Sequence, residues 1–507
     1  MPCIKEPFPF PGLMASSKIL LAVLAAAAAT LSAAAGEISP RVSPPAIPAH
    51  TVSLADFGGV ADGKTLNTDA FAKAIAALSG KGGGELIVPP GFWMTGPIRL
   101  RSHINLHLER GALLKFSGDF KRYPLVVIDR KGEKEVDSTA PVSGQEVSDV
   151  AITGEGVIDG SGEAWRPVKK EKLTDAEWKT LVKSGGVLNS AATMWWPSRE
   201  AMDGAKVVAR CRQAGSLRLA DYEPAHQFLR PPLLRLLNCR KVLLSGVTFQ
   251  NPPGWTLNPA LCENVSLVDV KVHNSPAAQN SDALDLESCR HAVVRDCTFD
   301  AGDDGICLKS GKDAAGRRIG APTEDVLVEG CVVYHAHGGF TIGSEMSGGV
   351  RNVRVNNCTF MGTDVGLRFK STRGRGGVVE KIFVSNIRMM NLTGDAINFD
   401  MYYAGQSPLE ESSVTDTNVP PVTEGTPQFR DIHIENVICR GADRAIVLEG
   451  LPEMPIRNIE LKNVSISARA GAFLTDADGI SFEHVEIDIQ SGQVLNLVRM
   501  KNFHFDP

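Results

Sequence analysis

The chain has 507 residues, of which 43% are hydrophobic and 6% aromatic, and its formal net charge is −5. This length and apolar content allow a large buried core, in one domain or in several. The mildly acidic balance argues against a nucleic-acid partner, which needs a basic face, and the 49 glycines favour a β-rich chain with many tight turns.

The N-terminal region has the pattern of a secretory signal. Lys18 precedes an apolar run over residues 19–29, and Ala33-Ala34-Ala35 offers a small-residue cleavage site. The run is shorter and richer in alanine than a membrane-spanning helix, so we favour a cleaved signal over residues 1–35 to a membrane anchor. No later stretch is long enough to cross a membrane, so we predict an exported protein with no stable membrane span after signal removal.

Two features follow the predicted signal. Residues 36–49 are rich in proline and predict a short extended linker, after which one domain is expected over residues 50–507. Asn67 then precedes apolar residues at helical spacing, which indicates an amphipathic helix with Asn67 as its N-cap. These apolar residues are Ala70, Phe71, Ala74, Ile75 and Leu78.

A repeated pattern explains most of the later chain. Counted from the first residue of each unit, apolar residues recur at offsets 0, +2, +5 and +7, and the residue at offset +4 is nearly always a turn former. The first positions of nine such units are Val242, Val265, Ala292, Val326, Val353, Ile382, Ile432, Ile459 and Ile480. Alternation, a turn and renewed alternation indicate a strand–bend–strand unit, and its repetition indicates a solenoid. We predict an all-β fold, a right-handed parallel β-helix with coils about 4.8 Å apart. The predicted N-terminal helix would close one open end of it.

The cysteines fall into two columns of this repeat. Three share offset −3 and three share offset +5, namely Cys239, Cys262, Cys289 and then Cys297, Cys331, Cys358. We interpret them as small buried hydrophobic residues rather than disulfides, and no metal-binding cysteine spacing occurs.

Residues 161–230 lack the repeat. They contain four tryptophans, many basic residues and a helix-like stretch over residues 175–184. We interpret them as a large insertion on one coil.

Four segments of the repeat share a further form: apolar, any residue, apolar, any residue, serine. They begin at Leu284, Ile306, Phe340 and Leu367. Asp282 and Asp304 both lie two residues before the first apolar position, so they should occupy equivalent places on neighbouring coils, about 5 Å apart.

The same alignment places more charged residues on this face. Asp303 and His337 both lie three residues before the first apolar position, and Arg368 and Lys370 take outward positions on the fourth segment. Four consecutive coils would therefore gather three carboxylates, a histidine and two cations.

Such a cluster predicts chemistry. Three neighbouring carboxylates repel one another, which should raise the pKa of at least one of them. A raised and an ordinary carboxyl group together suit general acid–base catalysis, as in glycoside hydrolysis, and the adjacent cations suit a substrate that carries carboxylates. We interpret Asp285 and Asp300, by contrast, as solvated turn residues.

These residues resemble the polygalacturonase family of glycoside hydrolases, family 28, in its exo-acting bacterial form. The family's motifs are Asn-Thr-Asp, Gly-Asp-Asp, Gly-His-Gly and Arg-Ile-Lys. Here they stand as Asn280-Ser281-Asp282, Gly302-Asp303-Asp304, Ala336-His337-Gly338 and Arg368-Phe369-Lys370. The resemblance extends from about residue 50 to the end, and the three departures, Ser281, Ala336 and Phe369, remove no charged group.

The resemblance implies a role for each site residue. Asp303 would be the general acid, and Asp282 and Asp304 would hold and activate the attacking water, which gives inversion. His337 would tune the protonation of the acid. The substrate-binding residues would be Arg368, Lys370, Asn280 and Tyr403.

The resemblance also implies the substrate and the location. We expect hydrolysis of α-1,4-galacturonosidic bonds in pectic polysaccharide or oligogalacturonide, without a cofactor or metal, by a secreted or periplasmic bacterial enzyme. We further hypothesise that the insertion at 161–230 walls off one end of the cleft, which would restrict cleavage to chain ends.

Three alternatives stay open. An exo-acting rhamnogalacturonan hydrolase would keep the fold and change the sugar. A pectate lyase would share the fold but would need calcium and a basic group for elimination. A non-catalytic β-helix adhesin or sugar-binding protein would give no reason for three acids and a histidine in register.

Overall fold

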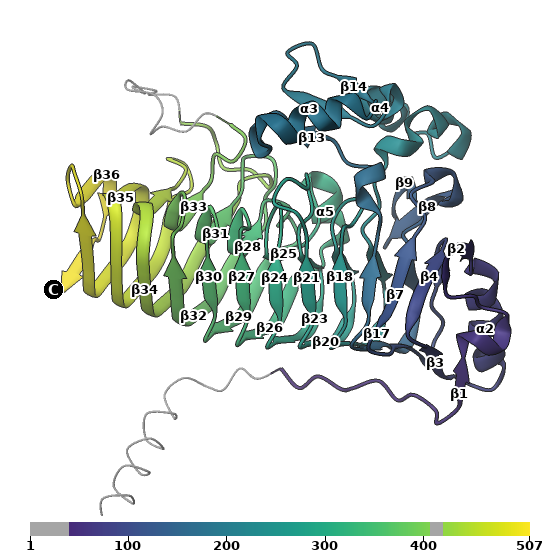
Figure 1. The fold of residues 1–507 in the computed structure, drawn as a ribbon. Helices are drawn as coiled ribbons and strands as arrows, with labels where there is room; N and C mark the ends of the chain where they lie inside the picture. The colour runs from purple at the N-terminus through teal and green to yellow at the C-terminus, as the bar shows by residue number, and fades with distance from the viewer. Residues whose placement is uncertain (1–39, 406–418, 507) are drawn as a thin grey trace, which may run out of the picture. The chain divides into compact units, whose positions relative to one another are not determined.

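The computed structural model describes residues 40–405 and 419–506. The predicted signal at 1–35 and the first residues of the predicted linker lie outside them. The described chain winds into a solenoid whose strands pair in parallel with the equivalent strands of the coils before and after (Figure 1). Each coil contributes three short strands, so three parallel sheets run along the solenoid. The predicted right-handed parallel β-helix is confirmed.

One of the three sheets carries the aligned acidic segments, and we call it the site sheet. Its strands are β5 (Ile98–Arg99), β10 (Val142–Gln145), β16 (Leu234–Leu237), β19 (Leu257–Ala260), β22 (Leu284–Glu287), β25 (Ile306–Lys309), β28 (Gly338–Gly343), β31 (Val365–Lys370), β33 (Asp395–Asp400) and β36 (Leu495–Lys501). Two long strands, β34 (Gln428–Glu449) and β35 (Ile456–Ile489), bend through successive sheets near the C-terminal end.

The other two sheets are formed by the strand–bend–strand repeat. The first contains β1 (Thr51–Ser53), β3 (Gly84–Val88), β6 (Ile104–Leu108), β11 (Ser148–Gly154), β17 (Arg240–Ser245), β20 (Glu263–Val268), β23 (Arg290–Arg295), β26 (Thr323–Glu329), β29 (Val350–Asn356), β32 (Val378–Met390) and β37 (His504–Asp506). The second contains β2 (Asp62–Leu66), β4 (Gly91–Thr95), β7 (Ala112–Phe116), β12 (Val157–Asp159), β18 (Thr248–Gln250), β21 (Lys271–His273), β24 (Thr298–Asp300), β27 (Val332–Tyr334) and β30 (Thr359–Met361).

The inward apolar columns form one continuous core. Phe249, Phe299 and Phe360 recur at the same offset and are each buried, and Phe369 stacks on Phe399 with ring centroids 4.2 Å apart. The cysteines behave in the same way, because all nine cysteines of the described residues are buried and none forms a disulfide. Both predicted columns therefore act as small apolar side chains.

The turn at offset +4 explains the residue types found there. All nine turn residues have φ between 51° and 78°, the left-handed region that favours Gly, Asn and Asp. His484 is the one residue of another type, and it adopts the same conformation with φ of 52°. The bend therefore requires a left-handed backbone conformation at this position. Gly, Asn and Asp adopt it most readily, but other residues such as histidine can adopt it too.

Helix α2 (Thr68–Gly80) covers the N-terminal end of the solenoid, as predicted (Figure 1). Its buried face consists of the apolar residues named above, from Ala70 to Leu78. The predicted side-chain cap is wrong. Asn67 is at the N-cap position, but its amide oxygen accepts from the Val60 N–H at 2.7 Å, and its amide nitrogen donates to the carbonyls of Val60, Thr65 and Met94. These bonds tie the start of the helix to the first coil.

Strands of the solenoid are absent between the end of β12 and the start of β16 within the described chain. This insertion contains α3 (Asp175–Lys183), α4 (Arg199–Gln213) and a small antiparallel sheet of β13 (Val168–Lys169), β15 (Met194–Trp196) and β14 (Val187–Leu188). A separate hairpin, β8 (Leu125–Arg130) and β9 (Glu133–Ser138), precedes it. Among the described residues, no helix is long and apolar enough to span a bilayer.

Candidate active site

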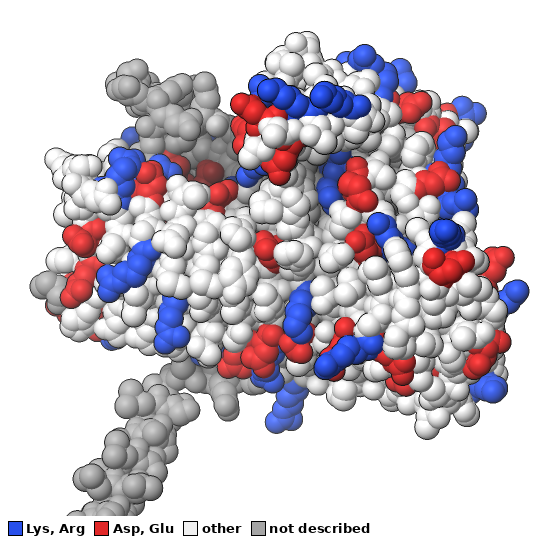
Figure 2. Space-filling view, in the orientation of Figure 1, with Lys and Arg blue, Asp and Glu red and all other residues white. Residues whose placement is uncertain are grey.

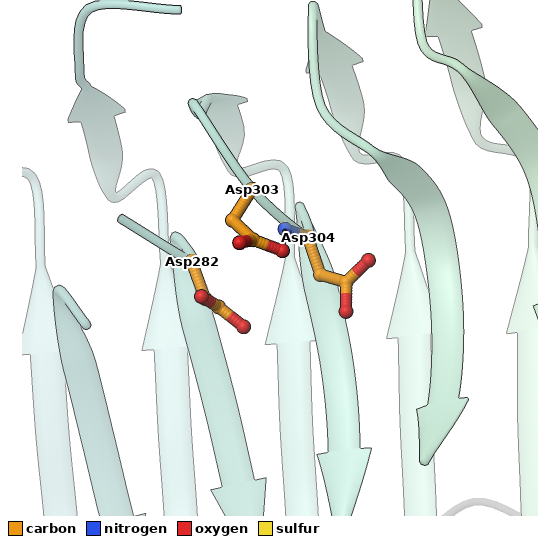
Figure 3. Close-up of side chains that lie close together, drawn as sticks. All are labelled: Asp282, Asp303 and Asp304. Atoms are coloured by element: carbon orange, nitrogen blue, oxygen red, sulfur yellow. Dashed lines mark hydrogen bonds between the residues drawn. The ribbon is translucent and has the colours of Figure 1, made fainter. Parts of the chain in front are cut away.

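The register of the site sheet brings the three aspartates together. Leu284 of β22 pairs with Ile306 of β25, so Asp282 lies beside Asp304 on the next coil, as predicted. The three side chains project from two neighbouring coils, and one carboxylate oxygen of each lies within 4.8 Å of the others (Figure 3).

Asp304 is the most completely paired of the three. It is buried, and it lies 2.7 Å from Lys370 Nζ and 3.2 Å from Arg368 Nη1, while the Thr341 hydroxyl donates to it at 3.2 Å. Burial alone would raise the pKa of Asp304, but Lys370, Arg368 and Lys309 outweigh it and hold the pKa well below its ordinary value. Asp304 is therefore ionised.

Asp303 contacts His337, as their shared alignment position predicts. The His337 N–H donates to the Asp303 carbonyl at 2.9 Å, and His337 Nδ1 lies 3.3 Å from Asp303 Oδ1. The Asp304 N–H donates to the same carboxylate at 3.0 Å, and the Asn280 amide donates to its other oxygen at 3.5 Å. Asp303 is half-buried, with 15% of its side chain exposed, so part of it remains accessible.

Asp282 has the opposite electrostatic environment to Asp304. Burial raises its pKa well above the ordinary value, and Asp285, Asp303 and Asp304 raise it further, whereas Lys309 at 3.8 Å lowers it. The predicted rise of at least one pKa in the cluster is found, but burial is its largest cause and the repulsion by neighbouring acids adds to it. Two neighbouring carboxyl groups thus have pKa values displaced in opposite directions, that of Asp282 upward and that of Asp304 downward.

The cations and the aromatic residue gather next to Asp304. The Tyr403 ring centroid lies 4.9 Å from Lys370 Nζ and 5.7 Å from the Arg368 guanidinium carbon. Asn280 contacts Asp303, and Arg230 donates to its amide oxygen at 2.9 Å. All eight residues that the sequence singled out are therefore within one site.

This geometry can be compared with known proteins. Residues 226–485 match the family described as glycosyl hydrolases family 28. A probable polygalacturonase of Vitis vinifera is 30% identical over 448 residues, which covers 85% of this chain and 78% of that protein. The chain belongs to glycosyl hydrolase family 28. The matched region contains the whole cluster of site residues.

Two further relatives of this family 28 protein are exo-acting by name. An exo-poly-alpha-D-galacturonosidase of Dickeya chrysanthemi is 26% identical over 460 residues, covering 87% of this chain and 71% of that protein. A crystal structure of a hyperthermoactive exopolygalacturonase from Thermotoga maritima superposes with a TM-score of 0.75 at 33% identity, covering 89% of this chain and 95% of that chain. The family 28 resemblance of the motifs is confirmed, and the protein is a glycoside hydrolase.

The interpretation of Asp285 as a solvated turn residue is wrong. Asp285 lies on strand β22, is fully buried, and is 3.4 Å from Lys309 Nζ; burial raises its pKa to about 7, against the opposing effect of Lys309. Its position in the strand does point outward, but the outward face is covered here. Asp300 is not a turn residue either, because it ends strand β24 and lies 3.1 Å from His335.

Sequence reasoning also missed several residues of this family 28 site. Lys309 pairs with Asp282 and with Glu345, and Arg230 donates to Asn280. Lys172 of the insertion reaches within 3.5 Å of His337 Nε2. One signal was present: Lys309 and Lys370 have the same place in the repeated five-residue form. No pattern in the sequence points to Lys172 or Arg230, because both lie outside the repeat.

The positive charge of the site comes from the chain itself. The carboxylates are close enough to share one cation, but Lys370, Arg368 and Lys309 already lie 2.7, 3.2 and 3.8 Å from Asp304 or Asp282. The arrangement gives no reason to place a metal there.

Proposed function

We propose that this family 28 enzyme hydrolyses α-1,4-galacturonosidic bonds of polygalacturonate from chain ends, with inversion at the anomeric carbon. The observation that carries the proposal is the group of three carboxylates beside Arg368, Lys370 and Tyr403. The exo-acting relatives from Dickeya chrysanthemi and Thermotoga maritima support the same substrate class.

The proposed mechanism uses the three aspartates in different roles. Asp303 donates its proton to the glycosidic oxygen as the bond to the anomeric carbon breaks. Asp282 and Asp304 hold a water molecule, and Asp304, which Lys370 and Arg368 keep ionised, takes its proton as the water oxygen bonds to the opposite face of the carbon. His337, in contact with Asp303, orients the acid.

Lys370 and Arg368 have different roles, since one pairs mainly with Asp304 and the other binds the substrate. The Lys370 side chain is only 5% exposed and lies closest to Asp304, whereas the Arg368 side chain is 19% exposed. We therefore assign the galacturonate carboxylate chiefly to Arg368, whose planar guanidinium can bind a carboxylate through two hydrogen bonds. Lys370 serves mainly to keep Asp304 charged, and Tyr403 forms a wall of the same subsite.

The insertion supports the exo-acting mode. Lys172 brings it to His337, and Arg230, at its end, donates to the Gln279 carbonyl at 3.1 Å and to Asn280. Figure 2 shows the insertion standing out from the solenoid, with lysine and arginine side chains interspersed with acidic ones on its visible face. A polymer that had to pass this segment would be blocked, so only a chain end would reach the carboxylates.

The predicted secreted or periplasmic location stays part of the proposal. The pattern of a signal over residues 1–35 supports it, and a polymeric pectic substrate requires an enzyme outside the cytoplasm. N-terminal sequencing of the exported protein tests it, with cleavage after Ala35 as the expected result.

Product analysis tests the activity. Polygalacturonate should yield saturated galacturonate products while its viscosity falls slowly. A rapid fall in viscosity with little sugar release would contradict the exo-acting mode, and a product that absorbs in the ultraviolet would indicate a lyase. Turnover of rhamnogalacturonan alone would identify the second sugar, and no turnover of either polymer would favour a binding protein.

A further inference from the structure

A second ionic cluster adjoins the three carboxylates and has no role in the proposed mechanism. We define the Lys309 cluster as Lys309, Asp285 and Glu345. Lys309 Nζ lies 3.4 Å from Asp285 Oδ1 and 3.3 Å from Glu345 Oε2, and it is 3.8 Å from Asp282 Oδ2. The Lys309 side chain is 5% exposed, so this contact to Asp282 is almost free of solvent screening.

The Lys309 cluster is expected to lower the stability of the fold. Three carboxylates surround one ammonium group, and desolvated charges of this kind usually cost more than they return in stability. Within the described residues, both carboxylate oxygens of Asp285 and Oδ1 of Asp282 have no hydrogen-bond partner. An arrangement that costs stability next to a reactive group is more readily explained by function than by folding.

We propose that Lys309, held by Asp285 and Glu345, is a positioning residue that orients Asp282 and favours its ionised, water-holding form. This inference rests on the hydrolytic function proposed above. The Trp255 ring, whose centroid lies 5.0 Å from Lys309 Nζ, limits the movement of the ammonium group on another side. Lys309 touches neither the acid Asp303 nor the proposed galacturonate ligand Arg368, so it acts through Asp282.

The charged groups that face Asp282 determine the expected pH effect. They come from every neighbouring element: Lys309 on β25, Asp285 on β22, Asp303 and Asp304 after β24, and Arg230 from the end of the insertion. Lys309 itself is faced by Asp282, Asp285, Glu345, Asp304, Cys307 and Lys370. Removing the positive charge of Lys309 leaves three acids around Asp282, so Asp282 would hold its proton to a higher pH.

Three substitutions separate charge from shape. Lys309→Met removes the charge, Lys309→Gln removes the charge but keeps a hydrogen-bond donor, and Lys309→Arg keeps both. The pH profile of kcat/KM on polygalacturonate should show its acid limb about one pH unit higher in the Met and Gln variants, because Asp282 must be ionised to hold the water. At the pH optimum of the wild type both should lose about tenfold in kcat/KM or more. The Arg variant should keep the acid limb of the wild type.

A matched control is available on the same sheet. Arg235 of β16 is also buried and pairs with Asp137, but its strand lies three coils before β25. Arg235→Met should lower the stability of the fold and leave the acid limb in place. If the acid limb of the kcat/KM profile also moves in Arg235→Met, the proposal is overturned, because the loss of any buried cation would then shift the limb.

The remaining outcomes are also decisive. The wild type is assayed first, and no release of galacturonate by it would refute the proposed function itself. With the wild type active, an unmoved acid limb in active Met and Gln variants would overturn the role of Lys309 alone. Failure of both neutral variants to fold, with Lys309→Arg folded, would likewise overturn it in favour of a structural role.

Discussion

The ion pair of Lys370 and Asp304 allows a quantitative prediction for the substitution Lys370→Met. Methionine keeps most of the apolar stem and removes the ammonium group, so Asp304 is left buried with Arg368 as its nearest cation. The two charges are 2.7 Å apart, and both side chains are at most 5% exposed. Their gross attraction is about 6 kcal/mol at an effective dielectric constant of about 20.

The net loss is smaller than this attraction. Removing one partner of a buried pair typically costs about 3–5 kcal/mol, and Arg368 at 3.2 Å still compensates part of the charge. We therefore expect a loss of about 3 kcal/mol in the free energy of unfolding at pH 7, at the lower end of that range.

The pH dependence identifies the cause of the loss. The pKa of Asp304 lies well below its ordinary value, so its pairing stabilises the fold fully above about pH 4, the pKa of an unfolded aspartate. The stabilisation is lost progressively as pH falls from there through the lower pKa of the folded state. The difference between wild type and Lys370→Met should therefore be full at pH 7 and shrink at pH 3. Urea unfolding at the two pH values measures it.

A double substitution provides the control. Lys370→Met combined with Asp304→Asn leaves no unpaired buried carboxylate, although the partly exposed Arg368 loses its partner, and should recover part of the lost stability. Equal destabilisation at both pH values, or a double variant no more stable than Lys370→Met, would refute the reasoning, because the loss would then come from packing.

Three further predictions concern single residues. Asp303→Asn should lower kcat by about 10²–10⁴ without changing the melting temperature, and full hydrolytic activity in this variant would mean that another group is the acid. Lys172→Ala should raise KM for oligogalacturonides about twofold to fivefold, as expected for one lost surface charge contact. Lys206→Ala on helix α4 of the same insertion should leave KM unchanged, and equal KM values in both variants would show that Lys172 does not contact the substrate. The Asp285→Asn variant should gain stability relative to the wild type as pH rises from about 4 to about 7. Between these values Asp285 is protonated in the folded wild type, because its pKa is raised to about 7, but it loses the proton on unfolding, which favours the unfolded state. Curves of unfolding free energy against pH that run parallel for the two proteins would contradict that pKa.

The repeat explains why so much of the site was predictable. In a parallel solenoid, residues with the same offset on neighbouring coils are adjacent, so alignment of the sequence with itself gives contacts in space. Asp282 and Asp304, and likewise Asp303 and His337, follow from this rule alone. The buried cysteine columns follow from it too.

The predictions from the sequence fail where the repeat says nothing about which segments contact each other. Alternation correctly places Asp285 on the outward face of its strand, but whether that face meets solvent depends on what lies over it. The hairpin of β8 and β9 reaches this strand, where Arg130 pairs with Glu287 at 3.0 Å, and the insertion reaches His337 two coils further on. Neither segment repeats, so their contacts, including that of Lys172 with His337, could not be derived from offsets.

The stereochemistry of the first product tests the central claim most directly, namely that Asp282 and Asp304 hold the attacking water while Asp303 acts as the acid. Proton NMR during the first minutes of hydrolysis of an oligogalacturonide distinguishes the two anomers before they interconvert. The account predicts that the β-anomer of the released galacturonate appears first from the α-linked substrate. An α-anomer as the first product would contradict it, because one of the carboxylates would then attack the sugar itself.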